Sequence, residues 1–431
     1  MNRTHTHTYY PFFVFFIFSI FTNVKAQTPD SLSIKIGQMI LIGMPKAEVD
    51  PIVLEEVRQG KAGSIIYFEK NIPKTNSYAG FKKMSWTYQQ AAPIPLFISI
   101  DQEGGKVNRL KEKYGFPRSI TAAAMGKAKT LDSVRFYASS IAATLAGLGI
   151  NVNFAPCVDL AINPENTVIV KPERSFSANE DSVAMMAIEY IKQHRKVGVI
   201  TALKHFPGHG SSKEDTHFDI ADVTKTWSDR ELKPYKILLD SGYVDAVMTS
   251  HIVNMTLDKK GLPGTLSVDI LDGILRKKLG FNGVVFSDDM QMHAITKNYG
   301  LEEAIKLAIN AGVDIMCFSN NISGSEERTV TKVHEIIRKF VERGEIKMER
   351  IDESFKRILN LKYRLNHNAD EIYRKEIVNV RLQAQMAQQN AEKARQQAET
   401  QMKIASHNAE QAKQEAEKNS KKKSKRKSRE E

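Results

Sequence analysis

The chain has 431 residues, of which 42% are hydrophobic, and it carries a formal net charge of +12 at pH 7. This length and apolar content supply one large core and permit one to three domains. The basic excess does not indicate a nucleic-acid partner, because much of it lies between Lys421 and Arg429 at the end of the chain. Only Cys157 and Cys317 occur, each in an apolar segment, so neither a disulfide framework nor a zinc site is indicated and no cofactor is expected.

Residues 1–26 are predicted to be a signal peptide. Arg3 precedes an apolar run from Phe12 to Phe21, and Ala26 offers the small residue that suits signal peptidase. The run has about ten residues, whereas a membrane-spanning helix needs about twenty, so an uncleaved anchor is the less favoured alternative. We therefore expect an exported protein that is periplasmic or extracellular.

Residues 27–366 are predicted to form one catalytic domain of repeated strand–helix units. Eight apolar, β-branched runs alternate with amphipathic stretches, and several are continuously hydrophobic, as in parallel strands covered by helices. The runs are 39–44, 64–68, 96–100, 152–158, 199–203, 246–250, 283–286 and 314–318. Eight such units predict an α/β fold, the TIM (β/α)8 barrel, although periodicity alone leaves a doubly wound open sheet as the alternative.

The positions of polar residues favour the barrel. Barrel enzymes gather their chemistry at the carboxyl ends of several different strands. Six polar residues stand at or just beyond the ends of five different runs, namely Asp101, Asp159, Lys204, His205, His251 and Asp288.

The most informative motif is the stretch Lys204–Gly210 (KHFPGHG), followed by Asp215 and His217. Proline and glycine within it prevent a helix, so the stretch is predicted to be a loop that holds polar side chains. It resembles the signature of the NagZ-type β-N-acetylglucosaminidases of glycoside hydrolase family 3, in which KHFPGHG precedes an Asp-x-His pair. The resemblance covers about residues 30–365 and implies a metal-independent, retaining exo-β-N-acetylglucosaminidase.

The resemblance also implies the catalytic residues. A retaining glycosidase needs a carboxylate at the anomeric carbon, and strand alternation lets only one of Asp288 and Asp289 face the pocket. The family's S/T-D-x-L/M-x-M pattern implies Asp288 as the nucleophile, and Asp289 is then interpreted as a helix-starting residue. The Asp-x-His pair implies His217 as general acid/base, with Asp215 orienting its ring.

Five further residues match the family's sugar-binding elements. The segment 100–109 (IDQEGGKVNR) is similar to the family's IDQEGGxVxR, the segment 173–176 (ERSF) resembles its RSF element, and the loop begins with its KH pair. These matches imply contacts with the sugar from Asp101, Arg109, Arg174, Lys204 and His205. The alternative for each is a salt bridge without a role in binding.

Two other functions are considered. A metal-dependent hydrolase would need ligands drawn from His205, His209, His217, Asp215 and Asp288. Against it, Phe-Pro-Gly separates His205 from His209, so the two cannot share one helix face as zinc-binding histidines do. A non-catalytic glycan-binding or scaffold protein is disfavoured because Asp288 and His217 are both present. The aglycone stays open between cell-wall muropeptides and other N-acetylglucosamine glycans, and phosphate could replace water as the acceptor.

Residues 367–431 are predicted to be a separate tail. It is rich in Ala, Gln, Glu and Lys, contains no Pro or Gly, and ends in the basic cluster already noted. Alanine recurs every seven residues from Ala384 to Ala412. This pattern predicts a solvated helical or disordered tail, with a weak coiled coil that joins copies of the chain as the alternative. The basic end could also contact an anionic envelope surface.

Overall fold

The computed structural model describes residues 31–128, 130–216, 220–321, 330–366 and residue 396. The predicted signal peptide and, apart from that last residue, the predicted tail lie outside the described residues. The boundaries assigned to the three segments therefore stay predictions. In the part that the structure describes, no helix is long and apolar enough to cross a membrane.

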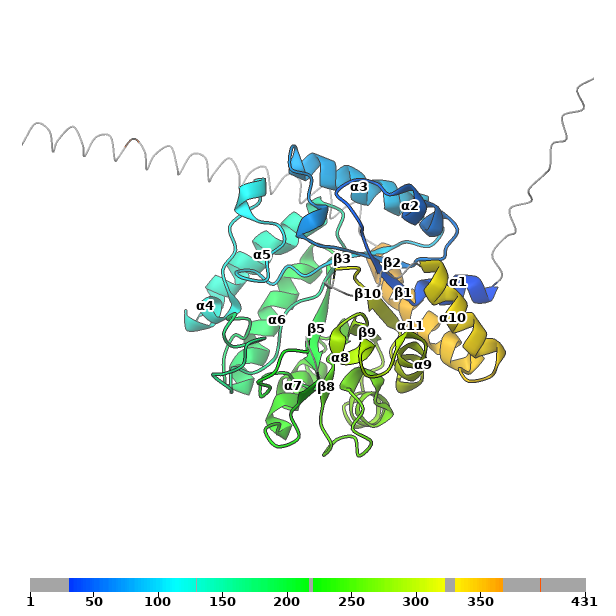
Figure 1. The fold of residues 1–431 in the computed structure, drawn as a ribbon. Helices are drawn as coiled ribbons and strands as arrows, with labels where there is room; N and C mark the ends of the chain where they lie inside the picture. The colour runs from blue at the N-terminus through cyan, green and yellow to red at the C-terminus, as the bar shows by residue number, and fades with distance from the viewer. Residues whose placement is uncertain (1–30, 129, 217–219, 322–329, 367–395, 397–431) are drawn as a thin grey trace, which may run out of the picture.

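Parallel strands close into a barrel at the centre of the molecule (Figure 1). Within the described residues, the order around the barrel is β1-β10-β9-β7-β5-β4-β3-β2. The strands are β1 (Ile40–Gly43), β2 (Ser64–Tyr67), β3 (Phe97–Ile100), β4 (Val152–Asn153), β5 (Ile200–Phe206), β7 (Ala246–Thr249), β9 (Val284–Asp289) and β10 (Ile315–Phe318). Each strand overlaps one of the predicted apolar runs, and β5 and β9 extend three residues past the ends of theirs.

The barrel is closed because the first and last strands pair with each other. Ile42 of β1 is in register with Ile65 of β2 on one side and with Phe318 of β10 on the other. A doubly wound open sheet would leave two free edges, so that alternative is excluded and the predicted (β/α)8 barrel is confirmed.

Helices form a layer outside the strands (Figure 1). They are α1 (Ser31–Gln38), α2 (Pro51–Arg58), α3 (Ser77–Ala91), α4 (Ala122–Lys127), α5 (Leu131–Gly147), α6 (Glu180–Lys196), α7 (Lys233–Asp240), a π-helix (Asp269–Lys278), α8 (His293–Thr296), α9 (Leu301–Ala311), α10 (Val330–Glu342) and α11 (Met348–Asn366). Local sequence signals explain where some of these helices begin. For example, Asp50 caps α2 by accepting hydrogen bonds from the amides of Ile52 and Val53, with Pro51 in the first turn.

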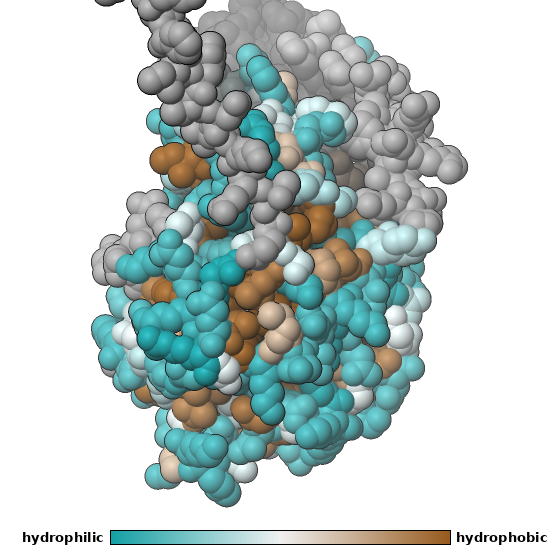
Figure 2. All heavy atoms as spheres, turned by 90° about the vertical axis from the view of Figure 1, so that its right-hand side faces the viewer, coloured by the Kyte–Doolittle hydropathy of each residue, from teal (hydrophilic) through white to brown (hydrophobic). Residues whose placement is uncertain are grey.

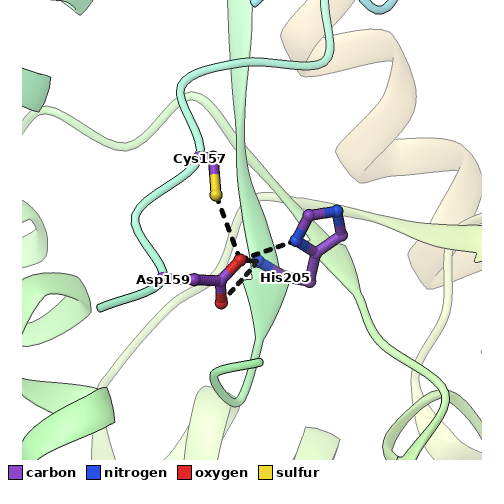
Figure 3. A group of neighbouring side chains, drawn as sticks. All are labelled: Cys157, Asp159 and His205. Carbon is purple, nitrogen blue, oxygen red and sulfur yellow. Dashed lines mark hydrogen bonds and ion pairs between the residues drawn. The ribbon is translucent and has the colours of Figure 1, made fainter. Parts of the chain in front are cut away.

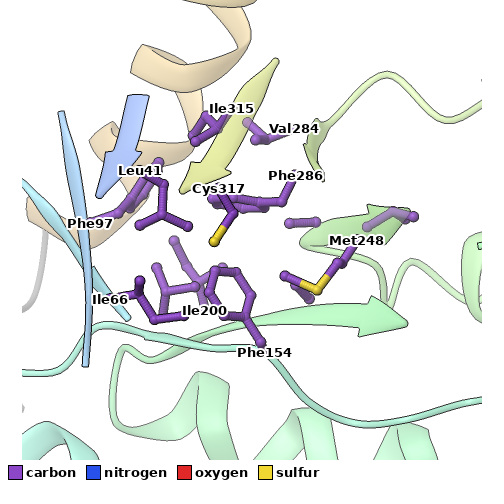
Figure 4. Packing of buried hydrophobic residues seen from close by; sticks show 14 of the residues in the cluster. Leu41, Ile66, Phe97, Phe154, Ile200, Met248, Val284, Phe286, Ile315 and Cys317 are labelled. Atoms are coloured by element: carbon purple, nitrogen blue, oxygen red, sulfur yellow. The ribbon is translucent and has the colours of Figure 1, made fainter. Parts of the chain in front are cut away.

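The inside of the barrel is filled by apolar side chains from opposite strands (Figure 4). The ring of Phe286 packs edge-on against Phe154 at 5.2 Å and against Phe97 at 6.1 Å between ring centroids. Cys317 also lies in this core. Because a close-packed interior resists displacement, these rings form a rigid apolar layer beneath the polar groups at the strand ends.

The amino-terminal mouth of the barrel is closed by α11. Lys362 donates to the side chain of Gln38 and to the carbonyl of Gly63, the residues just before β1 and β2. Asp314, at the start of β10, is surrounded by the guanidinium groups of three arginines from outside the barrel, Arg276, Arg350 and Arg357. This end carries structural ion pairs, so the chemistry belongs to the opposite mouth.

A short extra sheet lies beside the carboxyl-terminal mouth, where β6 (Ala221–Asp222) pairs with β8 (Ile252–Val253). It ties the chain that follows the KHFPGHG loop to the chain that follows β7. Elsewhere, the side face seen in Figure 2 is largely hydrophilic, with a group of apolar side chains near its centre.

Candidate active site

A cavity of about 210 Å³ opens at the carboxyl-terminal ends of the strands. Its lining includes six of the predicted site residues, which come from distant parts of the sequence: Asp101, Arg109, Arg174, Lys204, His205 and Asp288. Asp101 follows β3, and Asp288 stands on β9, four places away around an eight-stranded ring. The two carboxylates therefore lie on opposite walls of the mouth.

Lys204 is the central cation of the site, although its side chain is only 2% exposed. Its Nζ lies 2.7 Å from Asp101 Oδ1 and 2.8 Å from Glu103 Oε1. Burial opposes the charge on each group, but the opposite charges outweigh it, so the pKa of Lys204 is raised and the pKa of Asp101 is lowered. All three groups are therefore ionised at neutral pH, and charged groups make the stronger hydrogen bonds.

Glu103 was not among the predicted site residues, although it lies in the quoted segment 100–109. Its carboxylate accepts two hydrogen bonds from Arg174, at 3.0 Å from Nε and 2.7 Å from Nη2. Burial alone would raise the pKa of Glu103, but the positive charges of Arg174 and Lys204 outweigh this effect and lower the pKa. No local pattern could indicate this pairing, because Arg174 and Lys204 are 71 and 101 positions away from Glu103 and only the fold brings them together. Glu103 thus fixes the guanidinium that faces the cavity.

Arg109 is held less tightly than Arg174. Its Nη2 lies 3.5 Å from Asp101 Oδ2, and its guanidinium carbon lies 5.6 Å from the ring centroid of Phe68. Among the described residues, its buried Nε has no hydrogen-bond partner. Arg109 as a residue lines the cavity, so its guanidinium offers donors at this wall.

The orientation and the tautomer of His205 are fixed from two sides. Nδ1 lies 2.7 Å from Asp159 Oδ2, and Nε2 lies 3.1 Å from Arg174 Nη2 (Figure 3 shows the Asp159 contact). Because a guanidinium can only donate, Nε2 is the acceptor and Nδ1 carries the proton. Asp159 also accepts from the backbone amides of His205 and His209. Despite burial, these donors lower the pKa of Asp159 to about 2.

Both Asp288 and Asp289 line the cavity, which corrects the expectation that only one of them faces it. The pairing of β9 with β10 explains this result. Ile315 is in register with Phe286, and Cys317 is in register with Asp289. A step of two residues along β10 therefore matches a step of three residues along β9. This bulge breaks the alternation of side chains on which the expectation rested.

Asp289 does not begin a helix, so that interpretation was also wrong. Its carboxylate accepts hydrogen bonds from the amides of Gln291 and Ser319 and from the Ser319 hydroxyl, whereas the next helix, α8, begins at His293 after Met292. Burial raises the pKa of Asp289 to about 6. Its amide donates to Asp288 Oδ1 at 2.8 Å, so Asp289 also helps to orient the neighbouring carboxylate.

The stretch Lys204–Gly210 was predicted to be a loop, but its first three residues complete β5, so that part of the prediction was wrong and the loop begins at Pro207. Two hydrogen bonds hold this loop in place. Gly210 donates its amide to Glu231 Oε2 at 2.7 Å, and Trp227 Nε1 donates to the carbonyl of Pro207 at 3.3 Å. Gly208 has a φ of 123°, and a β-carbon there would lie 2.5 Å from Glu231 Cβ, so only glycine fits. Asp215 is half-buried at the end of this loop.

The predicted acid/base dyad is described only in part. Thr216, between its two members, lines the cavity, whereas His217 lies outside the described residues. The contact between Asp215 and His217 therefore stays a prediction. Of this segment, Thr216 is placed at the mouth of the barrel.

Residues 31–361 match the model of the glycosyl hydrolase family 3 N terminal domain. The chain belongs to glycosyl hydrolase family 3. Beta-hexosaminidase of Tolumonas auensis is 32% identical over 291 residues, which are 66% of this chain and 84% of that protein. Beta-hexosaminidase of Xylella fastidiosa (strain M23) is 33% identical over 285 residues, which are 64% of this chain and 82% of that protein.

Solved structures of β-N-acetylglucosaminidases and β-N-acetylhexosaminidases also match this chain. A glycoside hydrolase family 3 beta-N-acetylglucosaminidase from Paenibacillus sp. superposes with a TM-score of 0.71 at 35% identity, over 79% of this chain and 63% of that one. Beta-N-acetylhexosaminidase from Beutenbergia cavernae superposes with a TM-score of 0.70 at 27% identity, over 78% of this chain and 99% of that one. This family 3 chain is a glycoside hydrolase of the β-N-acetylhexosaminidase type.

Four of the five residues considered as ligands of a metal-dependent hydrolase are described, and these four do not form a ligand group, whereas His217 lies outside the described residues. Among the described residues, one group of three ligating side chains comes together, and it consists of Cys157, Asp159 and His205. Only His205 belongs to the earlier set. His209 lines the cavity, but its Nδ1 faces the Ser212 hydroxyl at 2.6 Å, outside this group.

Proposed function

We propose that this family 3 enzyme is an exported exo-β-N-acetylglucosaminidase that hydrolyses terminal β-linked N-acetylhexosamine with retention of configuration. One observation supports it above the others. A cavity of about 210 Å³ has a carboxylate, Asp288, on one wall and an ionised, hydrogen-bonded array around Lys204 on the other. The small volume favours a single terminal sugar, and the array supplies the fixed donors and acceptors that its hydroxyls need.

In the first step, a carboxylate oxygen of Asp288 attacks the anomeric carbon as the glycosidic C–O bond breaks, and His217 gives its proton to the leaving oxygen. In the second step, His217 takes a proton from water, the water oxygen bonds to the anomeric carbon, and the bond to Asp288 breaks. Asp215 holds the imidazole of His217. The amide of Asp289, 2.8 Å from Asp288 Oδ1, supports this assignment because it orients the nucleophile.

The same geometry supports the five proposed sugar-binding roles. Asp101 accepts from sugar hydroxyls, whereas Lys204, Arg109 and Arg174 donate to them. His205 Nε2 faces Arg174 at 3.1 Å, so the two form one surface for a hydroxyl. The partner is a glycan that contains N-acetylglucosamine, either a cell-wall muropeptide or another such glycan. No nucleic-acid partner is proposed.

The test is the profile of hydrolysis of aryl β-glycosides in the presence and absence of phosphate. We expect the N-acetylglucosaminide to be the best substrate and water to be the acceptor. A fluorinated mechanism-based glycoside should label a peptide that contains Asp288. Preference for another β-hexoside, a requirement for phosphate, or a label elsewhere in the chain would each contradict the proposal.

A further inference from the structure

Three side chains that suit a transition metal meet behind the sugar site (Figure 3). Cys157 Sγ, Asp159 carboxylate oxygen and His205 Nδ1 lie within 4.8 Å of one another. Cys157 and Asp159 follow β4, and His205 lies near the end of β5, so neighbouring strands bring them together. All three residues are buried.

Hydrogen bonds join the three side chains around the place that an ion would occupy. Protons now make the contacts that a bound metal would make. Asp159 Oδ2 accepts from His205 Nδ1 at 2.7 Å and from Cys157 Sγ at 3.2 Å. The other oxygen of Asp159 accepts from the amide of His209 at 2.7 Å, which holds the carboxylate in place. In a tetrahedral zinc centre such ligand atoms lie about 3.3–3.6 Å apart. To take an ion, the contact between Nδ1 and Oδ2 would widen from 2.7 Å by about 0.6 Å or more, and the contact between Sγ and Oδ2 would widen from 3.2 Å by a few tenths of an ångström.

We propose that Cys157, Asp159 and His205 form an inhibitory binding site for a zinc-like divalent ion. A thiolate, an imidazole and one carboxylate select zinc, cobalt or cadmium over magnesium and calcium, which prefer oxygen ligands alone. The Cys157 proton is released on binding. The fourth position of the ion is left for water.

Access is through the cavity, because His205 lines its wall. Val168 packs against Cys157 and lines the same wall, so the thiol lies one side chain behind the cavity surface. An ion that enters the cavity therefore meets the imidazole first and reaches the thiol when that ring shifts.

Inhibition follows from the tautomer of His205. At rest, Nδ1 carries the proton and Nε2 accepts from Arg174 Nη2 at 3.1 Å. A metal bound at Nδ1 forces the proton onto Nε2, and two donors then face each other. Arg174 or the ring must turn away, which disturbs the surface that holds the sugar. The ion and the sugar thus compete through His205, whose two ring nitrogens face the two sites, and this part of the inference rests on the proposed function.

The direct test is a titration of the full chain with Co²⁺, followed by the near-ultraviolet absorption that a cobalt–thiolate bond gives. We expect one ion per chain and a band that is absent from Cys157→Val. Cys317→Val is the matched control, because the second thiol also lines the cavity but lies outside the group, and it should keep the band. No band in the unmodified chain, or a band that persists in Cys157→Val, would overturn the site.

Two further measurements test the competition between the ion and the sugar. N-acetylglucosamine should weaken the apparent affinity for Co²⁺ by about tenfold, the usual size of such coupling. Zn²⁺ should inhibit hydrolysis of an aryl N-acetylglucosaminide, Mg²⁺ should not, and Cys157→Val should resist Zn²⁺ at least about tenfold better. Zn²⁺ inhibition that is undiminished in Cys157→Val would show that the ion acts elsewhere.

Cys157→Ser provides a second variant in case Val disturbs the packing. It keeps a donor to Asp159 but offers no thiolate, so it should also lack the cobalt band while unfolding at the same temperature as the unmodified chain. The spectrum requires no turnover, so an inactive enzyme that still gives the band would reject the proposed function and leave the metal site supported.

Discussion

Lys204 Nζ lies 2.7 Å from Asp101 Oδ1, although the two residues are 103 positions apart and β4 separates their strands. The long lysine side chain spans the end of β4 and joins two walls of the site. Lys204 also contacts Glu103 at 2.8 Å, so one buried ammonium balances two carboxylates. Such an array is set before the sugar arrives and costs little reorganisation when it binds.

The first prediction concerns that ammonium. Lys204→Met should lower the free energy of unfolding by about 3–5 kcal/mol, because it leaves two buried carboxylates without their common partner. It should also reduce kcat/KM by about a hundredfold or more, since the donors to the sugar lose their positions. Urea unfolding and steady-state kinetics measure the two effects.

The matched control for Lys204→Met is the double variant with Glu103→Gln. Glu103→Gln removes one of the two carboxylates that Lys204→Met leaves without their cation. It should restore part of the stability without restoring kcat/KM, because Arg174 loses its bidentate carboxylate partner. A Lys204→Met enzyme with normal kcat/KM would mean that the array is structural only.

The second prediction separates the adjacent carboxylates. Asp288→Ala should reduce turnover by a factor on the order of 10⁴ or more, as loss of a covalent nucleophile does. Asp289→Asn should cost much less, because an amide oxygen still accepts from the amides of Gln291 and Ser319. Steady-state kinetics on an aryl N-acetylglucosaminide measure both. The reverse order would move the nucleophile by one residue.

The fold could be predicted from the sequence because its signals are local. Each parallel strand overlaps a short apolar run, and the KHFPGHG stretch begins on the last three residues of one of them, β5. The errors arose where a local rule was broken by a neighbouring strand, as in the bulge that lets Asp288 and Asp289 both line the cavity. Glu103 was missed for a related reason, since only the closed barrel brings it to Arg174.

The third prediction concerns proton transfer. His217→Ala should lose most activity on substrates with poor leaving groups but retain more on activated aryl glycosides, which need little protonation. Asp215→Asn should lie between this variant and the unmodified enzyme. The ratio of kcat/KM for the two substrate types is the measurement. Equal losses on both types would indicate that His217 binds or folds rather than transferring a proton.

The fourth prediction is a dependence of stability on pH caused by Lys362. Its Nζ is buried, donates to Gln38 and Gly63, and lies 4.8 Å from the ring centroid of Phe97. Burial lowers the pKa of Lys362 to about 7 from the ordinary value of 10.5. Between these two values the unfolded chain binds the proton and the folded chain does not. The contribution of this group to stability therefore rises with pH from about 7 to 10.5 and is absent below about 7.

Urea unfolding at pH 7 and pH 9.5 measures this effect. The free energy of unfolding of the unmodified chain should rise between these values by a few kcal/mol more than that of Lys362→Met. Lys356→Met, an exposed lysine on the same helix, is the control and should follow the unmodified chain. If Lys362→Met kept the full dependence, Lys362 would be charged in the folded protein.

The last prediction concerns the tail. Truncation after Asn366 should change kcat and KM on a small aryl glycoside by less than about twofold, because every cavity-lining residue lies upstream and surface changes of this kind cost little. If the alanine heptads pack, the truncated chain should elute as a smaller oligomer. If the basic cluster holds the enzyme to an anionic surface, binding to envelope fractions should weaken with salt and vanish on truncation.

Truncation after Asn360 is the control that shows where the barrel ends. It removes Lys362, which closes the amino-terminal mouth, and Arg364, whose Nη2 lies 2.6 Å from the buried carboxylate of Asp245. Asp245 would keep Arg195 as its remaining ionic partner among the residues described. This shorter chain should unfold at a clearly lower urea concentration, whereas the chain that ends at Asn366 should not. A large fall in turnover for the longer chain, with its stability unchanged, would mean that the tail completes the active site.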